Sequence, residues 1–326
     1  MSELLDAAYD AAAAALRAAP RVVVATHENP DGDALGSLVG AVRGLRAAGL
    51  DVIGVRAASD LPREYRWLDG DGLSTTVPAG TGWLLLAVDC GSASRIAVPA
   101  GVREGADFVI DLDHHHDNTR FGDINIVDDG AACAAMMVRE LLVRLDVTLT
   151  PAIATPLYVG LVTDTGRFQY SNTDARAFRV AAELVGLGVR PQEIFQHVFE
   201  SVQASKLKVL ARALGRIELR LGGRLAVTYV TRADIDETGA DEASTDGVID
   251  SLRAIEGVEV AAFIRETAVG PRHKVSMRSA GGVVDVSRIA RESGGGGHMR
   301  AAGFASDLDR DALIDLIERE ARAGGA

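Results

Sequence analysis

The first half of the sequence repeats a pattern that restricts its fold: short runs of apolar, β-forming residues separated by polar connections. Five runs are expected to form strands, at residues 21–27, 51–57, 82–90, 106–115 and 123–128. Residues 33–49, between the first two runs, have apolar residues at helical spacing and end at Gly49, as a helix C-cap does. Strand–helix–strand order with buried strands predicts an α/β fold with a doubly wound, mainly parallel sheet.

The pattern changes along the rest of the chain. The elements expected there are helices at 130–146, 151–163 and 174–187, a helical stretch from Pro191, a hairpin over Gly222 and Gly223, a helix at 243–255, strands at 258–267 and 272–279, and a closing helix at 309–322. We therefore expect an N-terminal domain over residues 1–190, a helical linker over 191–211 and a smaller C-terminal α/β domain over 212–326.

Charge limits the partners that such a chain can have. The net charge is −12, and residues 1–205 carry 16 basic and 27 acidic groups, whereas residues 206–326 carry 18 and 19. Affinity for long duplexes comes from many phosphate neutralisations, so a nucleic-acid substrate is expected to be small and held locally. Taken alone, the acidic excess is also typical of an ordinary solvated surface.

Cysteine usage and hydropathy favour a cytoplasmic protein. Cys90 and Cys133 are isolated, so neither a CxxC metal clamp nor a disulfide framework is expected, and both are interpreted as core residues. No run of about 18 uncharged apolar residues occurs. The Ala-rich segment 11–19 follows acidic residues instead of a basic n-region, so it is expected to be a first helix.

Several side chains with metal-binding chemistry follow the apolar runs. They are His27, Asp31, Asp33, Asp89, Asp113, His114, His115, His116 and Asp164. Each has a simpler explanation, because an Asp after a strand is commonly a turn former or a helix N-cap, and most histidines bind no metal. Turn chemistry does not require histidines beside the aspartates, however, so the group as a whole favours a functional site.

Carboxylates together with imidazoles suit Mn²⁺, Mg²⁺ and similar ions. Four aspartates balance the charge of two divalent ions, so the pocket would accept a phosphate only when metal is bound. Paired ions roughly 3.5–4 Å apart activate water and stabilise the attacking and leaving oxygens of phosphoryl displacement. The sequence therefore predicts a two-metal hydrolytic site.

Four stretches resemble the motifs of the DHH phosphoesterase superfamily: "HENPDGDALGS", "AVDCG" around Asp89, "DHH" at 113–115, and "GLVTDTGRFQYSNT". The segment "GGGGHMRAAGF" at 294–304 resembles the glycine–His motif of the associated DHHA1 domain. The motifs occur in order over nearly the whole chain. A two-domain chain of this length resembles the nanoRNase and pAp phosphatase branch, whose members degrade short oligoribonucleotides and remove the 3′-phosphate of pAp.

This resemblance implies roles for individual residues. His27 and Asp31 would hold one metal ion, Asp33, His114 and Asp164 would hold the other, and Asp89 would bridge them. Two divalent ions are implied, Mn²⁺ first, with Mg²⁺ or Co²⁺ as alternatives. Asp113 is expected to fix an imidazole, and His115 to meet the phosphate and protonate the leaving oxygen. His116 is interpreted as a plain loop residue.

The resemblance also implies a substrate-binding segment in the C-terminal domain. Its members would be Gly295, Gly296, Gly297, His298 and Arg278, which would hold the substrate's terminal phosphate. A flexible loop is the simpler explanation of the glycines. Family members often carry a Lys where this sequence has Met299, followed by Arg300, so one phosphate contact is expected to be lost or shifted.

The function expected first is that of a metal-dependent phosphoesterase that hydrolyses short oligoribonucleotides to mononucleotides, removes the 3′-phosphate of pAp, or does both. The expected partners are short RNA and nucleotides such as pAp, neither long duplexes nor membranes, and a second copy of the chain in a homodimer. With the same chemistry, the alternative substrates are cyclic or linear dinucleotide messengers. A non-catalytic nucleotide or metal sensor would be expected to lack a metal ligand, whereas all six implied ligands are present.

Overall fold

The chain folds into two compact units, Met1–Ser201 and Val202–Ala326, and their boundary falls within the segment 191–211 that the sequence suggests as a linker. The computed structural model describes residues 3–56, 61–77, 80–98, 102–245, 247–280 and 284–325.

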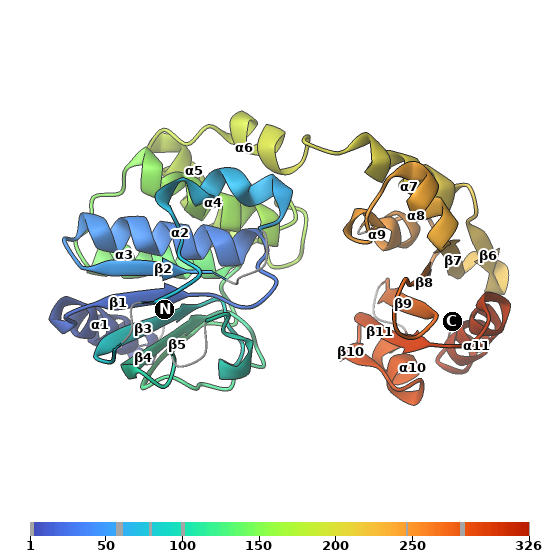
Figure 1. Ribbon diagram of the computed structural model, residues 1–326, viewed down its shortest axis with the longest axis horizontal. Helices are drawn as coiled ribbons and strands as arrows, with labels where there is room; N and C mark the ends of the chain where they lie inside the picture. Colours follow the sequence, from blue (N-terminus) through green and yellow to red (C-terminus); the bar gives the residue numbers. More distant parts are fainter. Residues whose placement is uncertain are drawn as a thin grey trace. The chain divides into compact units, whose positions relative to one another are not determined.

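The first unit contains a five-stranded parallel sheet in the order β2-β1-β3-β4-β5 (Figure 1). Its elements are α1 (Glu3–Ala18), β1 (Val22–Ala25), α2 (Gly32–Ala47), β2 (Val52–Val55), the 3₁₀ helix η1 (Arg63–Asp71), β3 (Trp83–Val88), the 3₁₀ helix η2 (Ala93–Arg95), β4 (Ala106–Asp113), β5 (Ile124–Val127), α3 (Ala134–Arg144), α4 (Pro151–Asp164), α5 (Ala175–Gly186) and α6 (Pro191–Val198). The predicted parallel sheet is therefore confirmed.

The strand order reverses its direction at β1. From β1 the chain continues to β2 on one side, whereas β3, β4 and β5 follow one another on the other side. Such a reversal opens a crevice at the carboxyl ends of the adjacent strands, where α/β proteins commonly bind ligands. The register pairs Ala25 with Ala87 and Val88 with Leu112, so β1, β3 and β4 end at the same edge.

The two faces of this sheet are covered differently. Residues of α1, α2, α3 and α4 pack with Val24, Leu86 and other strand residues on one face. On the opposite face, Val23 and Leu85 pack with Ile96 and with other residues of the connections, and no α-helical residue of the described segments joins that cluster. Connections thus cover both faces of the sheet, as in a doubly wound fold. Those on the second face are irregular, whereas helices cover the first face.

A row of glycines brings α2 unusually close to its neighbours. Its members, spaced four residues apart on one helix face, are Gly32, Gly36, Gly40 and Gly44. A Cβ on Gly36 would lie 2.7 Å from the backbone nitrogen of Gly160 on α4, and one on Gly160 would lie 2.6 Å from a carboxylate oxygen of Asp33. Only glycine permits this approach, which brings the start of α2 beside the end of α4.

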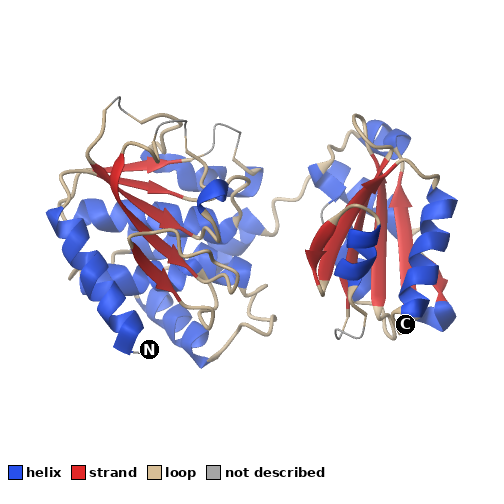
Figure 2. Ribbon diagram, turned by 90° about the horizontal axis from the view of Figure 1, so that it is seen from below, coloured by secondary structure: helices blue, strands red, loops and turns tan. Residues whose placement is uncertain are grey.

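The second unit contains a six-stranded mixed sheet in the order β10-β11-β9-β8-β7-β6, in which β7 and β8 are parallel and the other pairs are antiparallel. Its elements are α7 (Ala204–Leu214), β6 (Glu218–Arg220), η3 (Leu221–Gly223), β7 (Leu225–Val230), α8 (Arg232–Thr238), η4 (Ala243–Thr245), α9 (Val248–Arg253), β8 (Val260–Glu266), β9 (His273–Ser279), α10 (Val286–Glu292), β10 (Gly296–His298), β11 (Ala301–Ser306) and α11 (Arg310–Ala323). Figure 2 shows helices on both sides of this sheet. Residues of α10 and α11 pack on one face, and residues of α7, α8 and α9 pack on the other.

The hairpin expected over Gly222 and Gly223 is confirmed, since β6 pairs with β7 and both glycines have positive φ. The continuous helical stretch expected from Pro191 is wrong, because the structure has two helices there, α6 and α7. It is broken after α6, where the ring of Phe199 turns back onto Phe195 and lies under the guanidinium of Arg167.

One further expectation needs correction. The helix expected over 243–255 is reduced to η4 and the short α9, because Gly247 before α9 has a φ of 93°. The glycine-rich segment, for which a flexible loop was the simpler explanation, contains β10, which is paired with β11. Residue 57 of the expected strand 51–57 and residue 246 of the expected helix lie outside the described residues.

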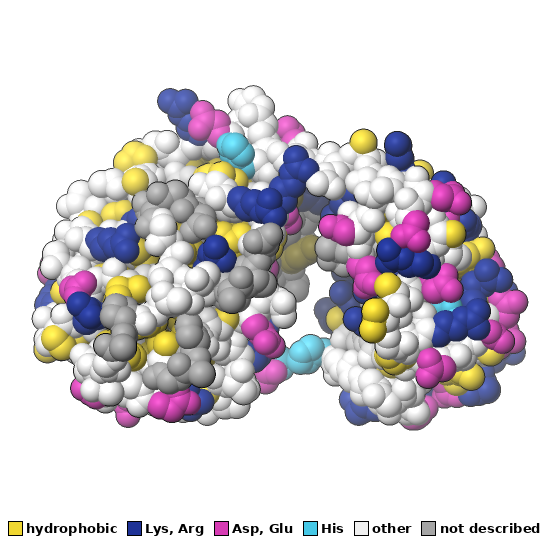
Figure 3. Space-filling view, viewed as in Figure 1, with side chains coloured by type: hydrophobic (Ala, Val, Ile, Leu, Met, Phe, Trp, Pro, Cys, Tyr) yellow, Lys and Arg dark blue, Asp and Glu magenta, His cyan; other side chains and the backbone are white. Residues whose placement is uncertain are grey.

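The surface and the core agree with the composition. On the visible face of the second unit, basic and acidic side chains are intermingled (Figure 3). Cys90 and Cys133 are buried free thiols, as expected for core residues. None of the described helices has the length and apolar character that a membrane span requires.

Candidate metal centre

The carboxyl edge of the first sheet gathers the predicted side chains of this unit. His27 and Asp31 follow β1, Asp89 follows β3, and Asp164 ends α4. Three groups have their ligand atoms within 4.8 Å of one another: His27 with Asp31 and Asp89, Asp33 with His114 and Asp164, and Asp89 with His114 and His115. Asp89 and His114 each belong to two groups, so the three groups form one continuous cluster.

His27 and Asp31 are both fixed by backbone contacts. The Nδ1 atom of His27 donates to the carbonyl of Glu28 at 2.6 Å, which leaves the lone pair on Nε2, 3.7 Å from the Asp89 carboxylate. One carboxylate oxygen of Asp31 accepts from the backbone N–H groups of Asp33 and Ala34, both at 3.1 Å. Asp31 is therefore the N-cap of α2, and within the described residues no hydrogen bond to its second oxygen is seen.

Asp89 lies at the centre of the cluster in a strained conformation. Its φ of 58° is rare for a residue with a side chain, and its N–H donates to the carbonyl of Leu112 at 2.9 Å. Its buried Oδ1 accepts no hydrogen bond from any described residue. The nearest imidazole nitrogens, of His114 and His115, lie 3.5 and 3.7 Å away, beyond ordinary hydrogen-bond distances.

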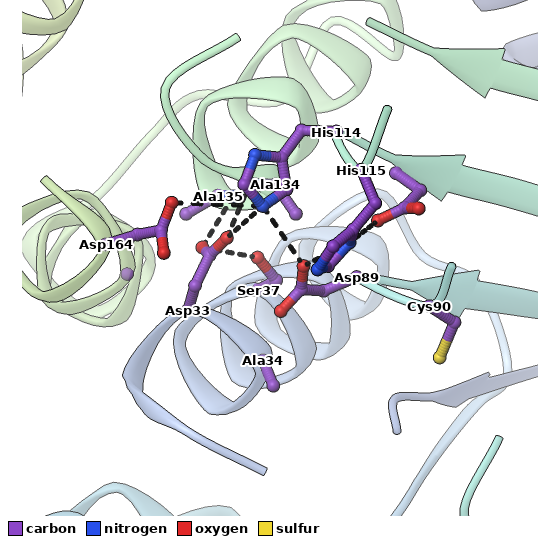
Figure 4. A network of polar contacts seen from close by, with 12 residues as sticks. Asp33, Ala34, Ser37, Asp89, Cys90, His114, His115, Ala134, Ala135 and Asp164 are labelled. Atoms are coloured by element: carbon purple, nitrogen blue, oxygen red, sulfur yellow. Dashed lines mark hydrogen bonds and ion pairs between the residues drawn. The ribbon is translucent and has the colours of Figure 1, made fainter. Parts of the chain in front are cut away.

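Asp33 joins the cluster to the start of α3. Its two carboxylate oxygens accept from the backbone N–H groups of Ala134 at 2.6 Å and Ala135 at 3.0 Å, and Ser37 donates to it at 3.3 Å (Figure 4). The N-cap residue of α3 itself, Cys133, makes no side-chain capping bond. Asp33 therefore caps α3 from another helix, and this fixes its orientation toward the cluster.

The carboxylates of the cluster repel one another. Burial, followed by the charges of Asp89 and Asp164, raises the pKa of Asp33 well above its usual value. Burial likewise raises the pKa of Asp164 to about 6. Burial alone would lower the pKa of His114, but the surrounding carboxylates raise it to about 10. The cluster therefore attracts positive charge strongly.

Asp113 and His115 form a hydrogen-bonded pair at the edge of the cluster. The Nδ1 atom of His115 lies 2.7 Å from Oδ1 of Asp113, and this bond raises the pKa of His115. Burial alone would raise the pKa of Asp113, but the bonds from His115 and Asn118 lower it. His115 is therefore the imidazole that Asp113 contacts. His116 is exposed and belongs to none of the three groups.

The sequence analysis missed two asparagines that hold site residues. The amide nitrogen of Asn118 lies 2.7 Å from Oδ2 of Asp113. That of Asn172 donates to the backbone carbonyls of Ala132 at 3.0 Å and Asp164 at 3.1 Å. Asparagine after a strand or helix usually indicates a turn, so its type alone gives no signal. The available signal was position, because Asn118 closely follows the DHH motif and Asn172 lies within the quoted stretch 160–173.

The donor set fits divalent metal ions that prefer oxygen and imidazole ligands. The buried Oδ1 of Asp89 lacks a hydrogen-bond donor among the described residues, and the pKa of Asp33 is raised by its acidic neighbours. The tautomer of His27 presents Nε2 toward Asp89. Each of these features would be satisfied by a bound cation, so the residues present are compatible with a metal centre.

In the second unit, the strand register aligns the predicted phosphate-binding side chains. His298 on β10 pairs with Ala301 on β11, and Ala301 pairs with Arg278 on β9. Directly opposite residues of antiparallel strands project from the same face. His298 and Arg278 therefore share one face of the sheet, with the small side chain of Ala301 between them.

The glycines beside His298 differ in what requires them. A Cβ on Gly295 would lie 2.5 Å from that of Phe304, and Gly297 has a φ of 137°. A Cβ on Gly296, by contrast, would meet no atom of the described residues within 4 Å. The hairpin thus explains Gly295 and Gly297, whereas packing gives no reason for glycine at position 296.

The fold and the site together define a class of protein. The sequence matches the DHH family, N-terminal domain, over residues 21–161 and the DHHA1 domain over residues 222–323. The chain belongs to the DHH phosphoesterase family, a class of metal-dependent hydrolases that act on phosphoester bonds.

Two named relatives and one solved structure are similar to most of this chain. The bifunctional oligoribonuclease and PAP phosphatase NrnA of Thermus thermophilus is 36% identical over 315 residues, covering 93% of this chain and 91% of that protein. The protein of the same name from Bacillus subtilis is 25% identical, covering 86% and 88%. The crystal structure of an exopolyphosphatase-related protein from Bacteroides fragilis has a TM-score of 0.86 at 21% identity, covering 98% and 96%, and shows the same fold.

Proposed function

We propose that this protein hydrolyses short oligoribonucleotides to mononucleotides, removes the 3′-phosphate of pAp, or does both. The observation that carries the proposal is the meeting at Asp89 of metal-compatible groups from separate strands and helices. The name of the Thermus thermophilus relative includes both activities, and the similarity extends over nearly the whole length of both chains.

We assign two metal positions within the cluster. His27 and Asp31 would hold one ion, Asp33, His114 and Asp164 the other, and Asp89 both. One of the three groups joins His27 and Asp31 to Asp89, and another consists of Asp33, His114 and Asp164. Two bound divalent ions, Mn²⁺ first, would neutralise the carboxylates, lower the pKa of water and polarise the phosphoryl oxygens. Every other contribution to the reaction is assigned to side chains of the chain itself.

His115 is proposed to give a proton to the leaving oxygen. Its Nδ1 is engaged by Asp113 at 2.7 Å, which leaves Nε2 as the nitrogen available to substrate. The negative charge of buried Asp113 stabilises the protonated ring and holds it in one orientation. Asp113 is therefore proposed as a positioning residue, and His115 as the acid.

The second unit is proposed to bind the terminal phosphate of the substrate. Arg278 and His298 supply donors on one sheet face, and Gly296 is exposed, with open space among the described residues where a Cβ would lie. The intermingled charges of this unit favour a short, locally held substrate over a long duplex. The buried free thiols are typical of the reducing cytoplasm, where we propose that the protein works.

The direct test compares four substrates in the presence of Mn²⁺: a labelled diribonucleotide, a 24-residue RNA, pAp and cyclic di-AMP. Asp89→Ala serves as the blank, and Asp129→Ala, which changes an exposed aspartate outside the three groups, as the matched control. We expect rapid loss of the dinucleotide or pAp, with the long RNA spared and Asp129→Ala fully active. Preferential turnover of cyclic di-AMP, or no turnover above the blank, would contradict the proposal.

A further inference from the structure

Asn118 lies behind the proposed acid and connects three segments of the first unit. Its amide nitrogen is 2.7 Å from Oδ2 of Asp113, 3.2 Å from Oδ1 of Asp111 and 3.2 Å from the carbonyl of Cys90. Its side-chain oxygen accepts from the N–H of Arg120 at 2.6 Å. One side chain thus links β4, the residue after Asp89 and the loop that follows the DHH motif.

The chemistry of this position requires an amide. Asp111 and Asp113 are fully buried and project from the same face of β4, two residues apart. A donor shared between them reduces their repulsion, whereas a carboxylate at position 118 would add a third negative charge. The oxygen of the same amide holds Arg120, whose φ is 50°, so Asn118 serves as donor and acceptor together.

The position of Asn118 determines which way Asp113 faces. By engaging Oδ2, it leaves Oδ1 directed at Nδ1 of His115. Without that constraint the ring could turn toward Asp89, whose Oδ1 lies 3.7 Å from the same nitrogen. We propose that Asn118 is a positioning residue for the reaction, which acts through Asp113 to hold His115 with Nδ1 as donor and Nε2 toward the substrate. This inference rests on the proposed function.

The test compares Asn118→Ala and Asn118→Asp with wild type. Asn118→Asp keeps an acceptor for Arg120 but loses the donor to Asp113. The matched control is Asn125→Ala, because the hydrogen bonds seen for the Asn125 side chain within the described residues go to the backbone of Gly122 in the same region. We expect both Asn118 variants to lower kcat roughly 10- to 100-fold, with KM changed less than about threefold and metal content unchanged. Asn125→Ala should stay within about twofold of wild type.

Two further measurements separate positioning from general damage. In a His115→Ala background, Asn118→Ala should cause little further loss, because the two residues act in one chain. Nitrogen-15 NMR of the His115 ring should show the same Nδ1 signal, from the bond to Asp113, in wild type and in Asn125→Ala. Both Asn118 variants should shift this signal, because the ring is then free to turn toward Asp89. If Asn118→Ala does not fold, Asn118→Asp and its spectrum decide the question.

The proposal is overturned if kcat of Asn118→Asp stays within twofold of wild type, if the loss is equally large in the His115→Ala background, or if the Nδ1 signal of His115 is the same in the Asn118 variants as in wild type. The spectrum needs no turnover, so it tests the positioning even if none of the phosphoester substrates is hydrolysed. Failure of the proposed function and failure of this inference are thus distinguishable.

Discussion

Asp89 combines a strained backbone with a buried charge. A left-handed conformation costs a residue other than glycine roughly 1–3 kcal/mol, and it persists only where the surroundings enforce it. Here the bond from its N–H to Leu112 and the meeting of β3 with β4 enforce it, and the carboxylate is thereby directed at His27 and His114. The strain is located at the residue on which the proposed metal groups converge.

Replacing Asp89 should therefore separate stability from function. Asp89→Asn keeps the size of the side chain but removes a charge that repels Asp33 and Asp164. Without metal, we expect the variant to be more stable than wild type by about 1 kcal/mol, whereas added Mn²⁺ should stabilise only the wild type. Thermal unfolding with and without EDTA measures both effects. Equal stabilisation of the two proteins by Mn²⁺ would be inconsistent with Asp89 as a ligand.

A second buried aspartate, Asp234, is held by ion pairs and by a helix cap. Asp234 in α8 accepts bonds from Arg216, from Arg212 and from the N–H and hydroxyl of Thr231. The bond from Arg216 comes first among the causes that lower its pKa. A carboxyl whose pKa is lowered on folding contributes stability above its ordinary pKa of about 4, and this stability is lost as the pH falls toward the lower folded value.

Asp234→Asn should destabilise the second unit by about 2 kcal/mol at neutral pH, a value reduced from that of a fully buried pair because both arginines are about one-third exposed. The difference from wild type should shrink as the pH falls below 4. Hydrogen exchange of amides in residues 202–326 at several pH values measures it. A difference that stays constant down to pH 2 would rule out this linkage.

At the scale of elements, the approach of α2 to α4 decides whether the cluster can form. Glycines at every fourth position of α2 leave no side chains on one helix face, and Gly160 does the same on α4. Helix packing normally separates axes by 8–10 Å because side chains intervene. The glycine row allows α2 and α4 to approach more closely where Asp33 and Asp164 must meet. The packing of the two helices therefore determines whether these carboxylates can share one site.

Gly36→Ala should force these helices apart. We expect a loss of about 1–3 kcal/mol in unfolding free energy and weaker metal binding, because Asp33 and Asp164 would separate. The control is Gly186→Ala at the end of α5, where a Cβ would meet nothing within 4 Å. Thermal unfolding and Mn²⁺ titration compare the two variants. Wild-type metal affinity in Gly36→Ala would show that helix spacing does not control the site.

The glycine–His hairpin offers a test within a single element. Gly296→Ala should leave thermal stability unchanged, since its Cβ would point into open space, but should raise KM roughly tenfold if substrate approaches this backbone. Gly297→Ala should lower stability because of its positive φ. The measurement is the KM of Gly296→Ala from steady-state kinetics, and an unchanged melting temperature shows that the variant is folded. An unchanged KM would leave the glycine with no role in binding.

For the molecule as a whole, the sequence predicted the features that depend on residue type and on the spacing of apolar residues. The apolar runs predicted the strands, and residues such as His27 and Asp89 at their ends predicted the location of the cluster, because parallel strands end at a shared edge. What it missed had no such signal. Gly296 and Ala302 have low β-propensity, so the hairpin of β10 and β11 was invisible before its pairing was known.

The remaining failures have similar physical reasons. The break after α6 has neither Gly nor Pro to mark it, since it depends on the packing of Phe199. The glycine row on α2 looks like a series of weak helix positions until α4 is placed against it. Asn118 and Asn172 bond to residues that are distant in the sequence, Cys90 and Ala132, and residue type does not reveal such partners.

We propose that one cluster in the first unit holds two metal ions that share Asp89. Equilibrium dialysis against Mn²⁺ with metal analysis of the protein tests it most directly. We expect two ions per chain for wild type, one for His27→Ala, one for Asp164→Ala and none for Asp89→Ala. A single ion in wild type that survives Asp89→Ala would show that Asp89 does not join two metal positions.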